Sequence, residues 1–320
     1  MTTYLIIGGA GFVGSHLARL LVRQDKEVHI VVRESTSRQR LANIEGKFGL
    51  HCAALDDIDA LDRIFKDVRP EIVVHLASAT RPVGNGAMFE DARCALNDVS
   101  QLLNVLSVAE NATRPPALLV RAGTLAEYGR GPNPYREDQR EVPVTSYAAG
   151  MIAATHLGDV LQRELSFPII NARLALVYGP GQSTQFLIPQ LVENCLRGRT
   201  TRVRYPDERR DLIYIDDVTS ALALLTDKPP VSHRTINIAT GQAPTMREVA
   251  ELVMQYTNAG ESTVEFGSGT SPNGVSNLVG SPELMQELYG WKAQIGIREG
   301  VLRLIRLTDA EAFDRNGAVA

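Results

Sequence analysis

The stretch IIGGAGFVGSHLARLL, residues 6–21, sets Gly8, Gly11 and Gly14 between an apolar run and a segment with helical spacing. Glycines at such a strand-to-helix turn keep it tight, let the backbone approach a pyrophosphate and let the helix pack close to the sheet. The free N–H groups at the start of the helix can then bind the anion. In this context the three glycines predict a dinucleotide-binding site.

Apolar runs typical of strands alternate with helical patterns, such as the one over 12–24, through the first half of the chain. This alternation predicts an α/β fold with a doubly wound, Rossmann-like parallel sheet that binds ligands at the carboxyl ends of its strands. We expect an NAD(P)-binding domain over 1–175 and a smaller, mainly substrate-binding lobe over 176–320, with some segments returning to the sheet. The runs are YLII at 4, VHIVV at 28, EIVVHLA at 71, ALLVRAG at 117 and PIINARLALV at 168.

The end of the second predicted strand indicates which cofactor binds. NAD sites usually carry an acidic residue there for the ribose 2′-hydroxyl, whereas the 2′-phosphate of NADP requires a nearby arginine. In KEVHIVVRESTSRQR, residues 26–40, Val32 stands at the expected acidic position and is followed by Arg33, Ser35 and Arg38. NADP(H) is therefore favoured, and NAD(H) remains the alternative.

The composition excludes several other classes of protein. The 33 basic and 37 acidic residues nearly balance and form no basic run, so neither nucleic acid nor a membrane surface is an expected partner. Cys52, Cys94 and Cys195 lack the spacing of a metal site, and we expect no metal. The cysteines are interpreted as buried thiols in a reducing compartment, which predicts a soluble cytoplasmic protein.

Several ordered motifs cover nearly the whole chain. Together they resemble those of the extended short-chain dehydrogenase/reductase family, which includes nucleotide-sugar epimerases, dehydratases and 4-ketoreductases. The resemblance implies a nicotinamide cofactor and a small-molecule substrate. The matching segments are GGAGFVG at 8, HLAS at 75, Asn97 as the asparagine that opens the next helix, GTLAEYG at 123, SYAAGM at 146, RLALVYGPGQ at 173 and RRDLIYIDDV at 209.

The resemblance also assigns catalytic positions. Thr124 matches the family's serine or threonine that hydrogen-bonds the substrate oxygen, and Tyr147 matches the tyrosine that exchanges a proton with it. Met151 stands where the family has a lysine that holds the nicotinamide ribose and lowers the tyrosine pKa. The further cofactor-binding positions that we assign are Phe12, Val13, Leu55, Leu76, Ala77 and Leu174, together with Tyr147.

Loss of the lysine bears on the direction of the reaction. A tyrosine near its reference pKa of about 10 is only about 0.1% phenolate at pH 7, which suits a proton donor better than a base. Met151 therefore favours an NADPH-dependent ketoreductase, while a cation from elsewhere in the fold could also replace the lysine. Leu125 and Ala126 replace the acid/base residues of the family's dehydratases. A nucleotide-sugar 4-epimerase and an inactive dinucleotide-binding homologue are the alternatives.

The substrate expected from the resemblance is a nucleotide-linked 4-keto-deoxysugar. Arg210 matches the arginine that binds the substrate diphosphate, with a structural pairing to Asp211 or Asp216 as the alternative. Leu176 replaces an asparagine that many relatives use for the same diphosphate. Gln185 is a further substrate candidate or a helix cap. Ser78, Thr80 and Arg81 either line the pocket or form an ordinary loop.

The resemblance further implies a homodimer. In relatives, the helices that correspond to 97–110 and 147–164 pair across subunits as a four-helix bundle. The apolar run LLNVLSVA on the first helix, and Ile152, Ala153, Leu157 and Val160 on the second, fit such an interface. They fit packing against the sheet equally well.

Overall fold

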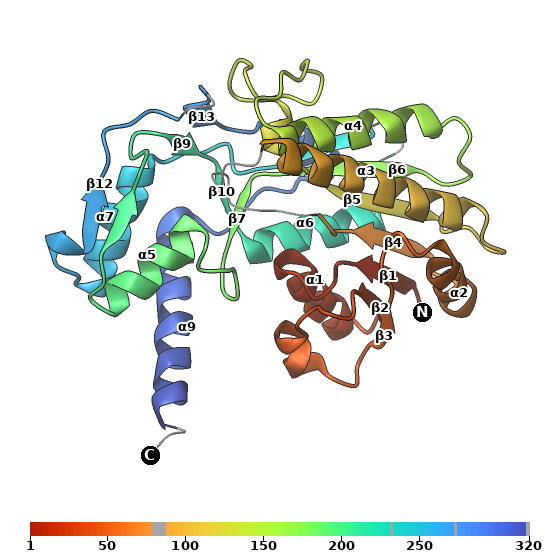
Figure 1. Cartoon of the computed structure of the whole chain (residues 1–320), viewed down its shortest axis with the longest axis horizontal. Helices are drawn as coiled ribbons and strands as arrows, with labels where there is room; N and C mark the ends of the chain where they lie inside the picture. Colours follow the sequence, from red (N-terminus) through yellow and green to blue (C-terminus); the bar gives the residue numbers. More distant parts are fainter. Residues whose placement is uncertain (79–87, 231–232, 272–273, 318–320) are drawn as a thin grey trace.

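The computed structural model describes residues 1–78, 88–230, 233–271 and 274–317. Its centre is a parallel sheet of seven strands in the order β11-β6-β5-β4-β1-β2-β3 (Figure 1). The strand order reverses between β1 and β4, which is the switch point where such sheets bind ligands. The strands are β1 (Thr3–Ile7), β2 (Glu27–Val32), β3 (Gly49–Cys52), β4 (Ile72–His75), β5 (Leu118–Thr124), β6 (Ile169–Leu174) and β11 (Thr235–Ile238).

The central strands are largely buried because helices cover both faces of the sheet. Every residue of β1 is buried, and Ile6 pairs with Ile30 on one side and Val74 on the other. The predicted doubly wound sheet is therefore confirmed, and the five predicted runs overlap β1, β2, β4, β5 and β6. Sequence inspection missed β3 and β11, which are only four residues long and include polar side chains.

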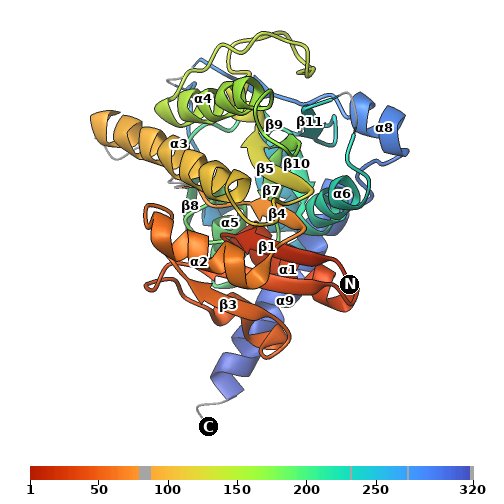
Figure 2. The same cartoon turned by 90° about the vertical axis from the view of Figure 1, so that its right-hand side faces the viewer.

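Helices cover both faces of the sheet (Figure 2). One buried core joins the sheet to α1, η1 and α6, and a second joins it to α2, α3 and α4. The helix predicted over 12–24 is α1, whereas α3 begins well before Asn97, so this asparagine does not open it. The bounds are α1 (Phe12–Arg23), η1 (Gln39–Ile44), α2 (Ile58–Val68), α3 (Met88–Glu110), η2 (Leu125–Glu127), α4 (Ser146–Leu161) and α6 (Ile215–Asp227).

A smaller lobe, at the left of Figure 1, has its own core built from α5, α7, α9, β8, β10 and β12. The boundary at residue 175 remains a prediction, and β11 is a later segment that lies in the main sheet. The remaining elements are β7 (Leu176–Tyr178), α5 (Leu187–Leu196), β8 (Thr201–Val203), β9 (Arg209–Arg210), β10 (Leu212–Tyr214), α7 (Met246–Thr257), η3 (Glu261–Thr263), β12 (Val264–Phe266), β13 (Asn277–Leu278), α8 (Glu283–Tyr289) and α9 (Ile297–Gly317).

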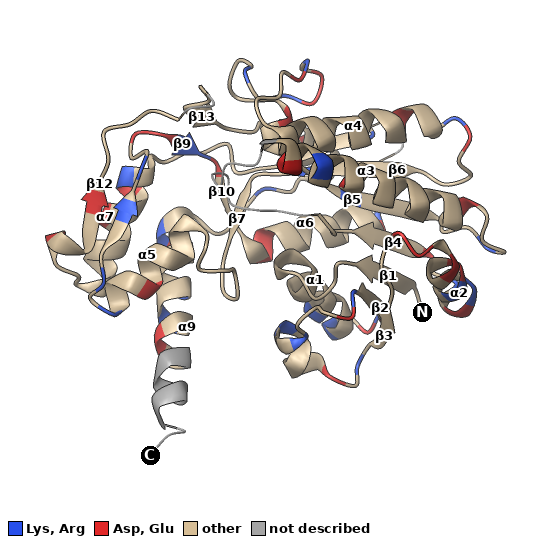
Figure 3. Ribbon diagram, viewed as in Figure 1, with Lys and Arg blue, Asp and Glu red and all other residues tan. Residues whose placement is uncertain are grey.

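Basic and acidic residues are scattered along the ribbon, most of which is uncharged (Figure 3). Within the described residues, no helix is both long and apolar enough to span a membrane.

The expectation of three buried thiols is wrong for Cys52, which is exposed at the sheet edge, while Cys94 is partly buried and Cys195 is buried. Edge strand β3 is covered less completely than its neighbours, and Cys52 is its last residue.

The turn from β1 into α1 leaves little room for side chains. Gly8 has a φ of +82°, in the left-handed region, and a Cβ there would lie 2.8 Å from the Ala77 backbone nitrogen. A Cβ on Gly14 would lie 2.4 Å from the Gly8 carbonyl oxygen. The Gly11 N–H donates to that same carbonyl at 2.9 Å. Close packing of α1 on β1 and β4 therefore requires glycine at positions 8 and 14.

We expect Gly14→Ala to lower the free energy of unfolding by about 1 to 3 kcal/mol, because the added methyl group overlaps the Gly8 backbone. Gly296→Ala is the matched control, since a Cβ at Gly296 meets no atom within 4 Å. The control should change stability by less than about 0.5 kcal/mol. Urea unfolding followed by circular dichroism measures both variants. Equal stabilities for the two would contradict this account of the turn.

Candidate functional site

The glycine turn presents an uncapped helix end at the carboxyl edge of the sheet. Gly11 is the N-cap of α1, makes no side-chain cap, and no acidic residue occupies the first turn. The free N–H groups and the positive end of the helix dipole therefore favour an anion. Phe12 and Val13 form the first helical residues and are partly buried against the smaller lobe. These features fit the pyrophosphate of a dinucleotide.

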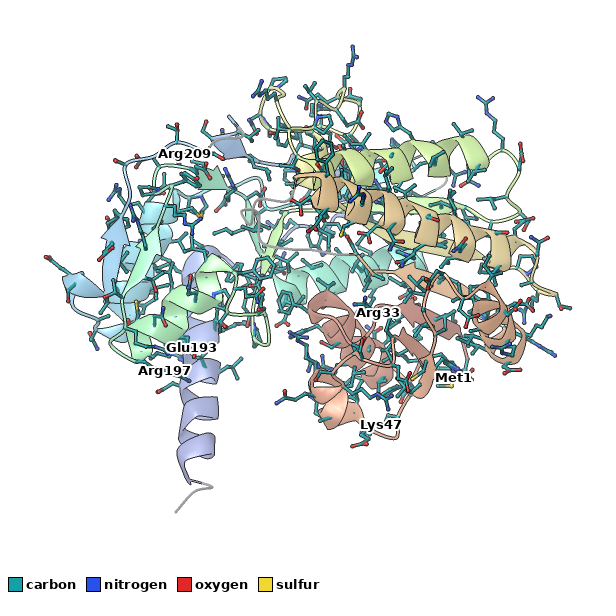
Figure 4. All side chains as sticks on the ribbon, viewed as in Figure 1. Met1, Arg33, Lys47, Glu193, Arg197 and Arg209 are labelled. Carbon is teal, nitrogen blue, oxygen red and sulfur yellow. The ribbon has the colours of Figure 1, made fainter. Side chains whose placement is uncertain are left out.

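The cationic candidates lie where β2 ends. Arg33 and Ser35 follow β2 and are exposed, and Figure 4 labels Arg33 in the N-terminal half of the molecule. In the part of the chain that the structure describes, the Arg33 side chain has no hydrogen bond or ion pair. Arg38 is also exposed, and its guanidinium contacts the Cys52 sulfur at 3.3 Å. Arg33 is thus the cation most available to a ligand at this strand end.

The other assigned cofactor positions differ in exposure. Leu76 and Ala77 follow β4 and are partly exposed beside the glycine turn. Leu55 is 6% exposed, belongs to the core under α2 and α3, and accepts a hydrogen bond from Asn104 through its carbonyl. Leu174, the last residue of β6, is 9% exposed. Leu55 and Leu174 therefore lie mainly in the core, and their side chains have little free surface for a ligand.

Tyr147 lies in the first turn of α4, which Thr145 caps by accepting a hydrogen bond from the Ala148 N–H at 3.1 Å. The tyrosine lines a cavity of about 20 Å³ between α3, α4 and the sheet, enough for one water molecule. The His75 Nε2 atom is buried and has no partner within the described residues. The polar lining residues are His75, Ser78, Asp98, Arg121 and Tyr147.

Burial raises the pKa of Tyr147 to about 12. The charge of Arg121 and a hydrogen bond with Ser78 oppose this increase, whereas the carboxylates of Glu127 and Asp98 add to it. A phenol with this pKa is protonated at neutral pH. Tyr147 can therefore donate a proton but is a poor base.

Thr124 lies at the end of β5, outside this cavity. Its hydroxyl oxygen accepts a hydrogen bond from the Ala126 N–H at 3.2 Å, and its N–H donates to the Glu127 carboxylate at 2.9 Å. Among the described residues, no hydrogen bond joins Thr124 to Tyr147. Ser78 lines the same cavity as Tyr147 and donates its hydroxyl hydrogen to Asp98 at 2.8 Å.

Met151 follows Tyr147 by one helical turn, is buried, and is contacted by a cation from another element. The Arg121 Nη2 atom donates to the Met151 carbonyl oxygen at 3.2 Å and lies 3.2 Å from its sulfur. The Arg121 Nη1 atom donates to Asn171 at 2.8 Å and to Thr155 at 3.2 Å. Arg121 is only 5% exposed. A guanidinium from β5 therefore lies beside the position where the resembling family has lysine.

A buried polar network continues from Arg121 behind the cavity. Thr155 donates to Glu127 at 2.9 Å, and Glu127 accepts the Arg173 Nε–H at 2.9 Å. Arg173 also pairs with Glu141 at 2.6 Å. Arg173 and Glu127 are almost completely buried, so each charge requires the other. The network joins β5, η2, α4 and β6 around Tyr147.

The structure gives mixed results for the substrate candidates. Arg210 is partly buried and pairs with Glu208, and not with Asp211 or Asp216 as the structural alternative supposed. Asp211 instead accepts hydrogen bonds from Thr240 and from the N–H groups of two glycines.

Gln185 is exposed and precedes Phe186, which is the N-cap of α5, so Gln185 does not cap the helix. Ser78 lies in the Tyr147 cavity. Thr80 and Arg81 lie outside the described residues. Asn97 is exposed in the middle of α3, and its neighbour Asp98 lines the cavity instead.

Sequence inspection missed Arg121, Glu127, Asp98 and His75 as members of this site. A signal existed for Arg121, because an arginine within the apolar strand ALLVRAG must find a buried partner. The other three required the fold, since they come from β4, α3 and η2.

Residues 4–239 match the model of the NAD dependent epimerase/dehydratase family. A curated relative from Rhizobium meliloti, named "Probable UDP-glucuronate 4-epimerase", is 26% identical and the match covers 98% of this chain and 97% of the relative. A UDP-glucose 4-epimerase from Thermotoga maritima, solved with UDP-glucose, has a TM-score of 0.87 at 23% identity, covering 97% of this chain and 100% of that one. The Thermus thermophilus UDP-glucose 4-epimerase, solved with NAD, has a TM-score of 0.82 at 25% identity, covering 96% and 99%.

Proposed function

The chain belongs to the NAD dependent epimerase/dehydratase family, and we propose that it is an NADPH-dependent ketoreductase acting on a nucleotide-linked 4-keto-deoxysugar. The observation that carries this proposal is the buried phenol of Tyr147, whose pKa is raised to about 12 and which has Met151 one turn later. At neutral pH this phenol is almost entirely protonated, so the donor form is present and the phenolate that would act as a base is scarce. Reduction of a ketone requires such a donor.

The residues at the carboxyl edge of the sheet fit a dinucleotide. The start of α1, which Gly11 begins without a side-chain cap, suits a pyrophosphate. Arg33 would hold the 2′-phosphate of NADP, since its side chain is exposed beside the end of β2. A nicotinamide bound there would supply the hydride for the reduction.

The chain itself would orient the ketone and supply the proton. The Thr124 oxygen accepts the Ala126 N–H, so the Thr124 hydroxyl hydrogen is free to donate to the substrate carbonyl oxygen. Tyr147 then transfers its phenolic proton to that oxygen as the alcohol forms. The Ser78 hydroxyl donates its single hydrogen to Asp98, so its oxygen can accept the phenolic hydrogen of Tyr147 before the transfer.

A nucleotide-sugar 4-epimerase is the second candidate, favoured by the names of the relatives described above. An epimerase must first oxidise an alcohol, for which Tyr147 would have to act as a base. The raised pKa of Tyr147 and the exposed Arg33 at the ribose position both favour the reductase.

A nucleotide diphosphate suits Arg210 as its ligand. The guanidinium is oriented by Glu208 and by the carbonyl oxygens of Val275 and Ser276. These contacts use Nη1 and Nη2 and leave the Nε–H for a phosphate oxygen. Glu208 offsets the positive charge of Arg210. We therefore expect Arg210 to orient the diphosphate through a hydrogen bond more than to attract it by net charge.

We also propose a homodimer through α3 and α4. The apolar run on α3 does not supply the surface, since Leu102, Val105 and Leu106 are buried against the sheet. Exposed apolar side chains nevertheless remain on both helices. They are Phe89 and Leu96 on α3, and Leu157 and Val160 on α4.

We expect Tyr147→Phe to reduce the rate of NADPH oxidation with a 4-keto-6-deoxy nucleotide sugar by at least about 100-fold, because the proton donor is lost. The dissociation constant for NADPH should change less than about threefold. Tyr256→Phe, on α7 in the smaller lobe, is the control and should retain activity.

The pH dependence gives a second check. A donor with a pKa of about 12 stays protonated through the neutral range, so kcat/KM for reduction should be level from about pH 6 to 9. Full activity of Tyr147→Phe would overturn the role of the phenol.

We expect Arg33→Ala to weaken NADPH binding by about 10- to 100-fold, the loss of a charge-assisted hydrogen bond to a phosphate. NADH binding should change by less than about threefold, because NADH lacks the 2′-phosphate. Arg163→Ala, an exposed arginine after α4, controls for the change in net charge. Calorimetric titration measures both cofactors. Equal weakening of NADPH and NADH would argue against a 2′-phosphate site at Arg33.

We expect Leu96→Glu or Val160→Glu to halve the mass measured by sedimentation velocity, because a buried carboxylate opposes the helix-helix interface. Ile58→Glu is the matched control, since Ile58 is 51% exposed on α2 and away from that interface. A wild-type protein that sediments as a monomer would refute the proposed dimer.

A further inference from the structure

Tyr147 has a charged neighbour that the sequence motifs do not assign. Arg121 comes from β5, crosses beneath α4 and contacts both the carbonyl oxygen and the sulfur of Met151. It lines the same cavity as Tyr147. Because Tyr147 and Met151 are one helical turn apart, the guanidinium lies on the face of α4 that carries the phenol.

The position of this guanidinium is fixed from several sides. Asn171 on β6 and Thr155 on α4 accept its Nη1 hydrogens, and the Met151 carbonyl accepts an Nη2 hydrogen. With only 5% of its surface exposed, the charge is poorly screened by water. A fixed, poorly screened cation acts strongly on a nearby phenolate.

We propose that Arg121 supplies the positive charge beside Tyr147 that a lysine at position 151 would otherwise supply, so that β5 and not α4 carries the cation. This inference rests on the proposed role of Tyr147 as proton donor. When Tyr147 releases its proton, Arg121 stabilises the phenolate that remains. Arg121 thus acts through Tyr147, as a positioning and charge-stabilising residue.

Other groups also face the Tyr147 phenol and either raise or lower its pKa. The carboxylates of Asp98 on α3 and Glu127 on η2 raise the pKa of Tyr147, and the Ser78 hydroxyl lowers it. His75 on β4 faces Arg121, and both burial and that charge lower its pKa to about 4, so His75 is neutral near pH 7. Arg173 is paired directly with Glu127, and among the described residues that shift the Tyr147 pKa the cation is Arg121.

The geometry also explains why methionine suits position 151. A lysine there would bring its ammonium group close to the Arg121 guanidinium, since the Met151 sulfur is already 3.2 Å from Nη2. Two buried cations in contact repel each other strongly. Methionine is neutral and adapts its shape to the arginine. Arginine at 121 together with methionine at 151 is therefore an alternative to lysine at 151, and either arrangement places one positive charge beside Tyr147.

The test measures the phenol directly in the protein without cofactor. A trifluorinated tyrosine is incorporated at position 147, because its more acidic phenol titrates in an accessible pH range, and 19F NMR follows its ionisation. The variants are Arg121→Gln, which removes the charge, Arg121→Lys, which keeps it, and Arg121→Gln/Met151→Lys, which moves it to α4. Arg163→Gln controls for net charge at an exposed position.

We expect Arg121→Gln to raise the pKa of the fluorinated phenol by about 1 to 2 units, the effect of one nearby charge in a protein interior. Arg121→Lys and the exchange variant should remain within about half a unit of wild type, as should Arg163→Gln. An unchanged pKa in Arg121→Gln would overturn the proposal. If Arg121→Gln does not fold, the exchange variant Arg121→Gln/Met151→Lys decides the question. A pKa of its fluorinated phenol more than about one unit above that of the wild type would overturn the proposal.

The same variants separate this inference from the proposed function. Fluorination at position 147 should restore part of the reduction rate lost in Arg121→Gln, because a more acidic phenol needs less stabilisation as a phenolate. A merely structural role for Arg121 predicts lower stability without such rescue, and that result would overturn the inference. Failure of the wild-type protein to reduce any ketone, with the 19F shifts as expected, would refute the proposed function and leave the charge relationship intact.

Discussion

A buried guanidinium must be paired, and this constraint organises the site. Arg121 and Arg173 point from adjacent strands into the space under α4, where water cannot solvate them. Their partners, Glu127, Thr155 and Asn171, come from η2, α4 and β6. Satisfying the two charges therefore fixes the short helix after β5 and the first turns of α4. The phenol of Tyr147 takes its position from that arrangement.

The glycine turn and the main sheet could be predicted from the sequence, because both depend on local patterns. A strand that is buried on both faces is mostly apolar, as β1 is, and a tight turn beside it requires glycine, as at Gly8 and Gly14. Strands β3 and β11 were missed because they are short, and β11 carries the buried Asn237, which is bonded by Tyr128. Their pairing depends on neighbours that are distant in the sequence.

The candidate site was predicted less completely than the fold. Motif spacing identified Thr124, Tyr147 and the unusual Met151, but the cation that compensates for Met151 comes from β5 and approaches only when α4 packs on the sheet. Arg210 likewise pairs with Glu208, two residues earlier in the chain. The structural alternative expected from the sequence was a pairing with Asp211 or Asp216. The partner of a long side chain that reaches another helix or strand is identified only once the three-dimensional structure is known. Such partners cannot be read from motif spacing alone.

We propose that this chain reduces a ketone and does not interconvert alcohols. The most direct measurement mixes purified protein with one equivalent of NADPH, deuterated at the transferable position, and a 4-keto-6-deoxy nucleotide sugar, and follows nicotinamide absorbance and product mass in a single turnover. We expect one NADPH to be oxidised for each ketone reduced and deuterium to be found in the product alcohol. Epimerisation of a 4-hydroxy nucleotide sugar without net consumption of cofactor, and no NADPH oxidation by the ketone, would contradict it.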